Sequence, residues 1–467
     1  MTDLSVLDHR PVPGEPREYD FPGFQRSSLP NGLTLIRAHV PGRPLLQAQL
    51  MVRGDSGGGA TSEMASQAGV TVLAARAMSE GTERRDAIEF VEASERLGAE
   101  LGASSGWDSF AVHVEVPRAR LSEAMALLSE LALQPSFPER EVDRLRDERL
   151  NDLQQAMADP RRRVDRAFPG VVYADGAPYA RPLAGTEETV AELDRDVLVA
   201  RHEELMRSGA STLIVCGDLE GVLLDDMVAT SFGAWEAAPG GSLDGKTADR
   251  NAAARRVVLI DRPGAPQSEI RVGHVGTPRV IEDFHALSVM NALLGGLFNS
   301  RLNRLLREER GYTYGVSSSF DMRRAAGPFS VRCAVESEVT APAIVDIMAE
   351  LERVREVPVE TDELDAARDY LVGVFPLRFE TSAQVAGALA GLVTHGLPDD
   401  ELDRYRPTIA AVSAEAVLAA ANDHIDPAAA SIVVVGDVSK FEEPLADAGY
   451  GAIEVVHDEG FGADAQD

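Results

Sequence analysis

The sequence predicts an α+β protein built from two similar halves, each a mainly antiparallel sheet with helices packed on one face. Three observations lead to this prediction. A stretch rich in glycine and alanine divides the chain near its middle, the two parts end in similar segments, and predicted strands come in hairpin-like pairs that groups of helices follow. The strict alternation of strand and helix that a doubly wound sheet requires is missing. We expect a hinge linker to join the halves into a clam-shell.

The division between the halves lies in residues 237–256. Small and polar residues without apolar periodicity fill this stretch, and residues 239–241 read Pro-Gly-Gly. Such a composition is typical of a linker. It predicts a first half over residues 1–236 and a second half over residues 257–467.

The two halves end in matching segments. Residues 211–218 read STLIVCGD, and residues 430–437, 219 positions later, read ASIVVVGD. Each is a β-branched run closed by Gly-Asp, the pattern of a buried strand that enters a turn. Asp194 and Ser413 share the same offset of 219, and each can cap the helix ahead of its strand. The common offset indicates a duplication, and two unrelated α/β units that end alike remain the alternative.

In the first half, periodicity and helix-capping residues predict the elements that precede the matching segment. Strands are expected at residues 33–37, 45–52 and 110–116, and helices at residues 63–78, 86–97, 120–134 and 138–159. Ser62 can cap the first of these helices. Pro138 and Pro160 suit the beginning and the end of the last one.

The second half repeats this arrangement of strand pairs and helices. Strands are expected at residues 257–260, 270–275, 312–320 and 329–336, and helices at residues 282–298 and 301–310, with a run of helices after them. Paired strands followed by grouped helices favour a sheet that is covered on one face.

Charge and composition exclude several functions. The 467 residues include 45 basic and 76 acidic ones, which gives a formal net charge of −31. This charge argues against nucleic acid or an anionic membrane as the main partner, and it fits solubility or a basic partner or peptide. The sequence contains no run of 18 apolar residues, the length that a membrane-spanning helix needs. Cys216 and Cys333 lack the spacing of a disulfide framework or of a thiolate metal site. Residues 1–20 are acidic and polar and contain no apolar run like that of a signal peptide. Together, these features predict a cytoplasmic protein.

Catalytic motifs are absent or stand in the wrong context. Zinc hydrolases of the HExxH or HxxEH type need two histidines four residues apart. The nearest of the nine histidines, His274 and His285, are eleven apart, so we expect both to be structural or surface residues. Residues 240–247 match a phosphate-binding loop but lie in the predicted linker. The GxSxG matches at residues 54–58 and 102–106 lack the strand-to-helix turn of a nucleophile elbow.

Two further segments carry a resemblance to a known family. Residues 69–82 read GVTVLAARAMSEGT, and residues 306–316 read LREERGYTYGV. Together with the duplicated halves, they resemble the insulinase/pitrilysin-type zinc peptidases, the inverzincins, over about residues 29–437. The chain is most similar to the short bacterial members and to the subunits of mitochondrial processing peptidase.

The resemblance implies that the metal motif of this chain is degenerate. In the family, the first segment carries HxxEH, whose two histidines bind zinc and whose glutamate is the general base. Here the same positions hold Val72, Ala75 and Arg76, none of which can do so. A third ligand falls near Asp152. We therefore expect no metal and no catalytic residue in the first half, and we hypothesise that an Arg76–Asp152 ion pair replaces the metal.

The second segment keeps the pattern of the family. There, an arginine and a tyrosine seven residues apart reach across a closed chamber to the substrate at the zinc site, and they correspond to Arg307 and Tyr314. A helix that ends at Gly311 and a strand after it can direct both side chains into one cavity. Arginine would donate to a peptide carbonyl, and tyrosine to the oxyanion of a tetrahedral intermediate. The alternative is a solvated arginine at a helix end and a packed tyrosine.

The chain lacks the family's metal motif but retains its substrate-binding arginine and tyrosine. This combination implies that two subunits contribute different parts of one active site. We expect a non-catalytic, substrate-binding subunit of a heterodimeric zinc metallopeptidase, with zinc in a homologous HxxEH-bearing partner and activity only in the complex. The acidic charge would favour basic peptides, unless it is spread over the outer surface and serves solubility. The alternative function is a peptidase-like binding or assembly protein with no enzymatic role.

Overall fold

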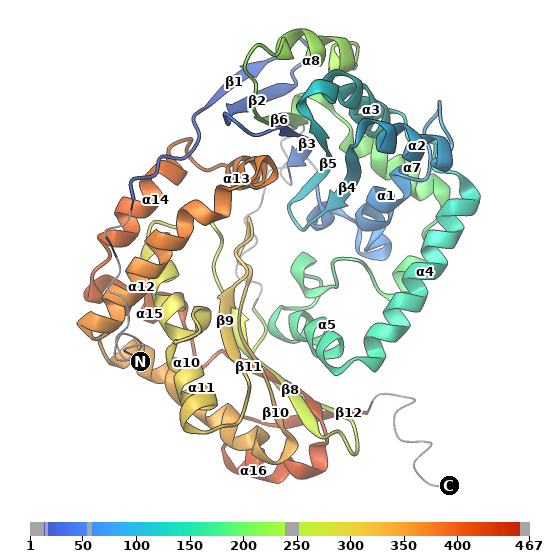
Figure 1. Ribbon diagram of the computed structural model, residues 1–467. Coiled ribbons are helices and arrows are strands. Elements are labelled where there is room, and N and C mark those ends of the chain that lie inside the picture. The colour runs from blue at the N-terminus through green and yellow to red at the C-terminus, as the bar shows by residue number, and fades with distance from the viewer. Residues whose placement is uncertain (1–13, 15–16, 54–57, 239–251, 458–467) are drawn as a thin grey trace, which may run out of the picture.

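The computed structural model describes residue 14 and residues 17–53, 58–238 and 252–457. It contains two six-stranded sheets, the first at the top of Figure 1 and the second at the bottom, with helices packed around both. Most of the predicted linker, the phosphate-loop match and most of the first GxSxG match lie outside the described residues. The second GxSxG match lies almost entirely within strand β4 (Glu100–Ser105), and Ser104 is part of that strand.

The first sheet has the strand order β1-β2-β6-β3-β5-β4. Its strands are β1 (Phe24–Ser28), β2 (Thr34–His39), β3 (Leu45–Arg53), β4 (Glu100–Ser105), β5 (Ser109–Pro117) and β6 (Ser211–Gly217). Strands β2 and β6 are parallel, with Ile36 opposite Ile214, and the other neighbours are antiparallel. Every residue of β6 is buried, as the β-branched run predicts for a central strand.

The second sheet repeats the first. Its order is β12-β7-β11-β8-β10-β9, and its strands are β7 (Val257–Asp261), β8 (Gln267–Val275), β9 (Val316–Phe320), β10 (Pro328–Glu336), β11 (Ser431–Gly436) and β12 (Ile453–His457). Matching β2, β3, β4, β5 and β6 with β7, β8, β9, β10 and β11 reproduces the order and direction of every pairing. Two mainly antiparallel sheets in similar halves are confirmed. The outer strands differ, because β1 is antiparallel to β2 whereas β12 is parallel to β7.

The helices of the first half include all the predicted ones, of which only the first begins at a clearly different residue, and three that were not predicted. The helices are α1 (Val70–Met78), α2 (Ala87–Leu97), α3 (Leu121–Leu133), α4 (Glu139–Ala158), α5 (Pro160–Val172), α6 (Glu187–Ala191), α7 (Arg195–Leu205) and α8 (Leu224–Phe232). The three that were not predicted are α5, α6 and α8. The prediction of a helix from residue 63, capped by Ser62, is wrong. The Glu63 carboxylate accepts hydrogen bonds from the backbone N–H groups of Gly69 and Thr71, at 3.0 and 2.8 Å, so the chain folds back before α1 begins.

In the second half, two predicted helices form in part as π-helical turns, which are wider than α-helical ones. The helices are α9 (Phe284–Asn291), α10 (Arg301–Asn303), α11 (Thr340–Glu356), α12 (Thr361–Val374), α13 (Ser382–His395), α14 (Glu401–Ala410), α15 (Ala414–His424) and α16 (Glu442–Asp447). Residues 292–296 and 304–309 continue α9 and α10 as π-helical turns. The predicted strand at 312–320 starts only at Val316, because Thr313 and Gly315 form a turn ahead of it. Among the described helices, none is both long and apolar enough to cross a membrane.

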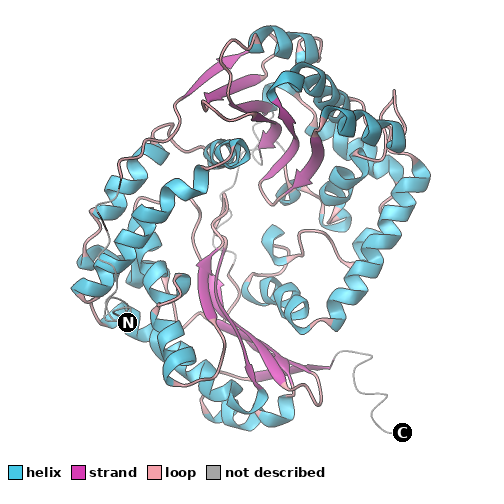
Figure 2. Cartoon of the chain, viewed as in Figure 1, coloured by secondary structure: helices cyan, strands magenta, loops and turns pink. Residues whose placement is uncertain are grey.

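The halves exchange one helix each. The helices of a half cover one face of its own sheet, as predicted, and the opposite face is covered by a helix from the other half (Figure 2). Helix α13 packs on the first sheet through Val385, Ala386, Leu389, Leu392 and Val393, and α5 packs on the second through Val164, Phe168, Val171 and Val172. The halves are therefore interlocked through two apolar cores as well as joined by the linker.

Candidate substrate-binding site

The positions of the degenerate zinc motif lie on α1, which packs against β4 and α7. Val72 is half-buried, Ala75 is buried and Arg76 is exposed. Neither of the first two side chains has an atom that could bind a metal or accept a proton. In the described part of the chain, no group of three or more histidine, cysteine, aspartate or glutamate residues could hold a metal ion. The residues present do not fit the zinc of the family.

Arg76 pairs with Glu148 of α4 and not with Asp152. Its Nη2 lies 2.5 Å from Oε2 of Glu148. Asp152 instead binds Arg149 and, at 2.7 Å from its Oδ1, Nη2 of Arg162 on α5. The hypothesis of an Arg76–Asp152 ion pair is therefore wrong. Glu148, one helical turn before Asp152, lies nearer to α1, whereas Asp152 faces α5.

The hydrogen bond from Arg162 is the main reason why the pKa of Asp152 lies below its ordinary value. Both side chains are close to half exposed, at 42 and 44 %. Asp152 thus joins the end of α4 to the beginning of α5 at the surface, and its carboxylate is occupied by arginines rather than free for a metal.

Arg307 and Tyr314 line one cavity of about 490 Å³, which we call the tyrosine cavity. Arg307 lies on the π-helical turn of residues 304–309, and its guanidinium stacks on the ring of Phe298, with Cζ 3.7 Å from the ring centroid. Its Nη2 also lies 2.7 Å from Oε1 of Glu308. These contacts hold the guanidinium in a fixed position at the cavity wall.

Tyr314 precedes β9 and is 96 % exposed. The prediction placed it on the strand, but the turn at residues 313–315 keeps it in the connection. Gly311, with φ of +68°, reverses the chain after Arg307, as expected for a residue that ends a helix. Because Tyr314 is almost fully accessible, the alternative of a packed tyrosine does not describe this site. The structure brings both residues to one cavity, and their role in substrate binding stays a prediction.

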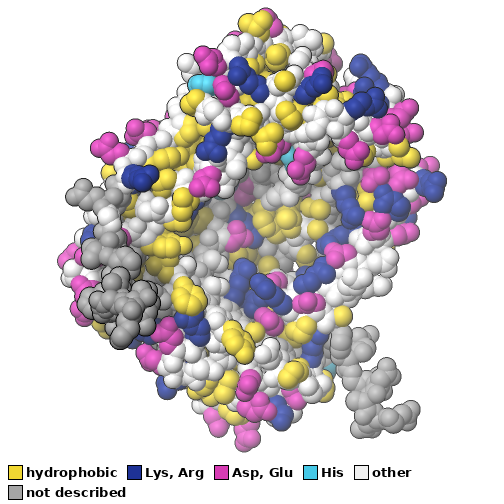
Figure 3. Space-filling view, in the orientation of Figure 1, with side chains coloured by type: hydrophobic (Ala, Val, Ile, Leu, Met, Phe, Trp, Pro, Cys, Tyr) yellow, Lys and Arg dark blue, Asp and Glu magenta, His cyan; other side chains and the backbone are white. Residues whose placement is uncertain are grey.

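A second cavity of about 490 Å³ adjoins the first, and we call it the arginine cleft. Helices α4 and α5 and the segment after them line one side of it, and β8, β10 and the β9–β10 connection line the other. Arg271 and Arg332 belong to the walls of both cavities. Dark blue side chains gather in the hollow at the centre of Figure 3. The arginine cleft thus lies between the two halves of the chain, next to Arg307 and Tyr314.

The arginines of this cleft are the functional candidates that the sequence did not reveal. Besides the two shared residues, they are Arg149, Arg162, Arg166, Arg181 and Arg323. They come from several segments of the chain, and residues 161–163 form a local run of three arginines. The packing of α5 on the second sheet brings them together with the arginines of the second half, and the sequence pattern does not predict that packing.

An aromatic and acidic cluster adjoins the cleft, and two of its residues, Trp107 and Arg323, line the cleft wall. The guanidinium of Arg323 lies 4.5 Å from the ring centroids of both Trp107 and Tyr179. The Tyr179 hydroxyl donates to the buried carboxylate of Asp108 at 3.0 Å, and the backbone N–H of Arg324 donates to the other carboxylate oxygen. Burial raises the pKa of Tyr179 well above its ordinary value, so its hydroxyl stays protonated. This cluster ties the first half to the second.

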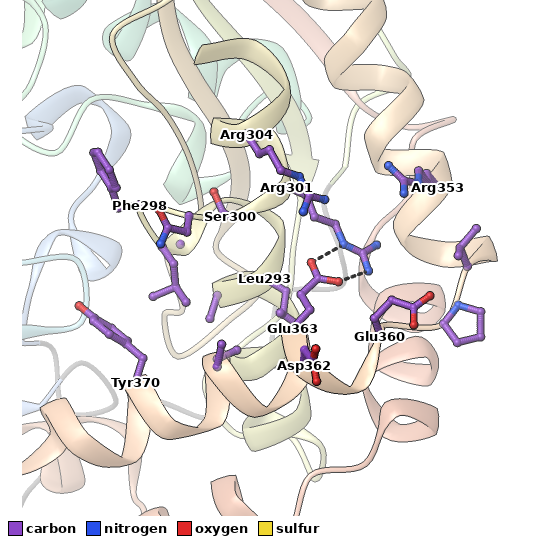
Figure 4. Close-up of a pocket in the computed structure, with 18 residues that line it drawn as sticks. Leu293, Phe298, Ser300, Arg301, Arg304, Arg353, Glu360, Asp362, Glu363 and Tyr370 are labelled. Atoms are coloured by element: carbon purple, nitrogen blue, oxygen red, sulfur yellow. Dashed lines mark hydrogen bonds and ion pairs between the residues drawn. The ribbon is translucent and has the colours of Figure 1, made fainter. Parts of the chain in front are cut away.

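A further cavity of about 680 Å³ adjoins the tyrosine cavity, because Phe298 belongs to the walls of both, and Figure 4 shows its lining. Nε and Nη2 of Arg301 bind the carboxylate of Glu363 at 2.8 and 2.9 Å. This arginine holds α10 against α12 through these two donors, whereas its buried Nη1 has no hydrogen-bond partner among the described residues. We assign the cavity no chemistry.

His274, His285 and the two cysteines are packed inside the second half and the first sheet. His274 is buried, and its Nε2 accepts a hydrogen bond from the backbone N–H of Asp426 at 3.0 Å. His285 is partly buried against Phe284 and Tyr405, and burial lowers its pKa. These contacts agree with the structural role expected for both. The thiols of Cys216 and Cys333 are buried and free, and burial raises the pKa of each to about 12.

Comparison with protein families identifies this fold. The description "Insulinase (Peptidase family M16)" matches residues 55–187, and "Peptidase M16 inactive domain" matches residues 192–371. The chain belongs to the insulinase family of peptidases, M16, and the match to the inactive domain of that family runs from the end of the first half into the second.

Known proteins agree with this assignment. An uncharacterized zinc protease of Mycobacterium leprae is 27 % identical over 318 residues, which cover 67 % of this chain and 69 % of the relative. A protein of Helicobacter pylori named non-peptidase homolog YmxG is 23 % identical over 350 residues, or 73 % of this chain and 78 % of the relative.

Solved structures share the fold. The crystal structure of a peptidase M16 inactive domain from Pseudomonas fluorescens aligns with a TM-score of 0.80 at 23 % identity, over 88 % of this chain and 98 % of that one. A protease from Helicobacter pylori aligns with the same TM-score at 17 % identity, over 89 % of this chain and all of that one. The two-half architecture of this chain is thus the fold of the family.

Proposed function

We propose that this chain is the non-catalytic, substrate-binding subunit of a heterodimeric zinc metallopeptidase that acts on peptides. One observation carries the proposal. Arg307 and Tyr314 share a cavity in a chain whose zinc-motif helix has no ligand for a metal. A homologous partner with HxxEH would hold the zinc, and metalloendopeptidase activity would belong to the complex. As part of the same proposal, we place the chain in the cytoplasm, where its two free thiols would remain reduced.

The two side chains differ in a way that suits these roles. Arg307 is held by Phe298 and Glu308, so its guanidinium is preorganised to donate to a peptide carbonyl. Tyr314 has no hydrogen-bond partner among the described residues and extends into solvent. A phenol that donates to the oxyanion formed at the zinc of another subunit must be free of contacts in its own chain.

Zinc content and reconstituted activity test the proposal. The chain alone should bind no stoichiometric zinc and cleave no peptide, and the complex with an HxxEH-bearing partner should do both. In that complex Tyr314→Phe should lower kcat by about a hundredfold, because one oxyanion donor is lost. Tyr370→Phe is the matched control, since Tyr370 is half exposed on α12 and lies outside the tyrosine cavity. Stoichiometric zinc on this chain alone, or full activity of Tyr314→Phe, would contradict the proposal.

A second candidate is a peptidase-like binding or assembly protein without enzymatic role. The observation in its favour is the name of the Helicobacter pylori relative, a non-peptidase homolog. The two candidates differ in their native partner. A native complex whose subunits all lack HxxEH, and which hydrolyses no peptide, would favour the second candidate.

A further inference from the structure

The walls of the tyrosine cavity and the arginine cleft carry the opposite charge to the protein as a whole. Their basic residues are Arg149, Arg161, Arg162, Arg166, Arg181, Arg271, Arg307, Arg323 and Arg332, and their acidic residues are Asp165, Glu269 and Asp321. The entire chain has 45 basic and 76 acidic residues. The negative charge therefore lies elsewhere, and the expected acidic chamber for basic peptides does not agree with these walls.

Part of this positive charge is neutralised within the protein. Arg271, only 2 % exposed, binds Asp165 at 2.8 Å and Glu269 at 3.1 Å. Arg323 binds Asp321, although its buried Nη1 has no hydrogen-bond partner among the described residues. Asp152 forms ion pairs with Arg149 and Arg162, and Glu187 forms one with Arg166. These pairs build the wall and are not free for a ligand.

Two arginines at the junction of the cavities are not neutralised in this way. Arg332 of β10 is exposed, lines both cavities, and its Nε donates to the Ser330 hydroxyl at 3.0 Å without a carboxylate partner in the described residues. Arg161, in the first turn of α5, is exposed in the tyrosine cavity and likewise forms no ion pair with any described residue. Their guanidinium groups can each bind a carboxylate through two parallel N–H groups.

We propose that this junction binds acidic side chains of a peptide, so that the subunit selects acidic rather than basic substrates. The inference rests on the proposed function in one respect, that Arg307 and Tyr314 contact the cleaved peptide bond. Arg161 and Arg332 line the same cavity, so carboxylates near that bond would reach them. A lysine or arginine there would meet like charge beside a partly desolvated wall, which costs free energy.

A nucleic acid is the weaker ligand for the same site. The protein has a net charge of −31, and a dense polyanion would be repelled over a long range in every approach. A peptide with two or three carboxylates carries much less charge and gains the local pairing. The cleft therefore fits a short acidic segment.

Binding to the full chain without its partner tests this inference. Three labelled peptides of equal length, with four glutamates, four glutamines or four lysines, are titrated by fluorescence anisotropy. The glutamate peptide should bind about tenfold more tightly than the glutamine peptide, and the lysine peptide more weakly than either. Arg332→Gln and, as a second variant, Arg161→Gln should each remove most of this preference and leave the affinity for the glutamine peptide unchanged. Arg96→Gln is the control, because Arg96 is an exposed arginine of α2 outside both cavities.

Several results would overturn the inference. They are tighter binding of the lysine peptide, no measurable binding of the glutamate peptide, an unchanged preference in both variants, or equally tight binding of a single-stranded oligonucleotide of the same charge. The measurement needs no peptidase partner. If the chain prefers acidic peptides but forms no active complex with an HxxEH-bearing partner, only the proposed function is contradicted. If that complex is active but the chain does not prefer acidic peptides, only this inference is contradicted.

Discussion

Nη2 of Arg76 lies 2.5 Å from Oε2 of Glu148, and this ion pair joins α1 to α4 at the positions of the degenerate zinc motif. A second arginine, Arg144, binds the other oxygen of Glu148 at 2.5 Å. The side chains of Arg76 and Glu148 are 53 and 42 % exposed, so the pair contributes less than about 1 kcal/mol to stability. The contact shows which residues of the two helices meet, and that geometry leads to the first prediction.

Histidines at positions 72 and 76 should create a zinc site. They would stand four residues apart on α1, and Glu148 already reaches the side chain at position 76. Two imidazoles and a carboxylate are a common ligand set for zinc. We expect V72H/R76H to bind one zinc ion in a calorimetric titration, where the wild-type chain binds none. It should cleave no peptide, because Ala75 cannot act as a base. Zinc binding as tight in V72H/R76A would show that the pair of histidines is not responsible.

Asp152 should stabilise the fold only above acidic pH. Its pKa is lowered in the folded state, chiefly by the hydrogen bond from Arg162, so its contribution is present above the unfolded-state pKa and is lost as the pH falls through the folded-state pKa. Because the pair is close to half exposed, Asp152→Asn should lower the free energy of unfolding at pH 7 by no more than about 1 kcal/mol. In urea unfolding, the difference from wild type should shrink as the pH falls below the unfolded-state pKa of about 3.9 and through the lower folded-state pKa. An equal loss at every pH would indicate a packing effect instead.

The sequence predicts the duplicated architecture but not how the halves are joined. The β-branched run that ends at Gly217 and its match at Gly436 become the central strands β6 and β11. The helical pattern of residues 382–395 shows that α13 has apolar positions, but periodicity cannot tell which sheet those positions cover. For the same reason, Arg161 and Arg332 could not be predicted to meet at one cavity. The motif around Arg307 and Tyr314 could be recognised from the sequence, because its residues are neighbours in the chain.

Tyr179→Phe should destabilise the contact between the halves. The change removes the hydroxyl that donates to Asp108 at 3.0 Å and leaves this buried carboxylate one hydrogen bond short. The expected loss is about 1–3 kcal/mol in the free energy of unfolding, measured with urea at pH 7. Tyr370→Phe, at an exposed site, should change stability by less than about 0.5 kcal/mol. A loss for Tyr179→Phe no larger than for this control would mean that the hydrogen bond contributes nothing to stability.

The exchanged helix α13 should make the first sheet depend on a residue of the second half. Leu389 is fully buried and packs with residues of β2 and β6, among them Ile36 and Ile214. Leu389→Ala leaves a cavity there and should cost about 2–5 kcal/mol. Amide hydrogen exchange in β2 and β6 should accelerate in proportion, although both strands lie more than 170 residues away in sequence. Leu351→Ala is the matched control, because Leu351 is equally buried but packs only within the core of the second half. If Leu389→Ala accelerated exchange only in the second sheet, the first sheet would be independent of α13, and the halves would unfold as separate units.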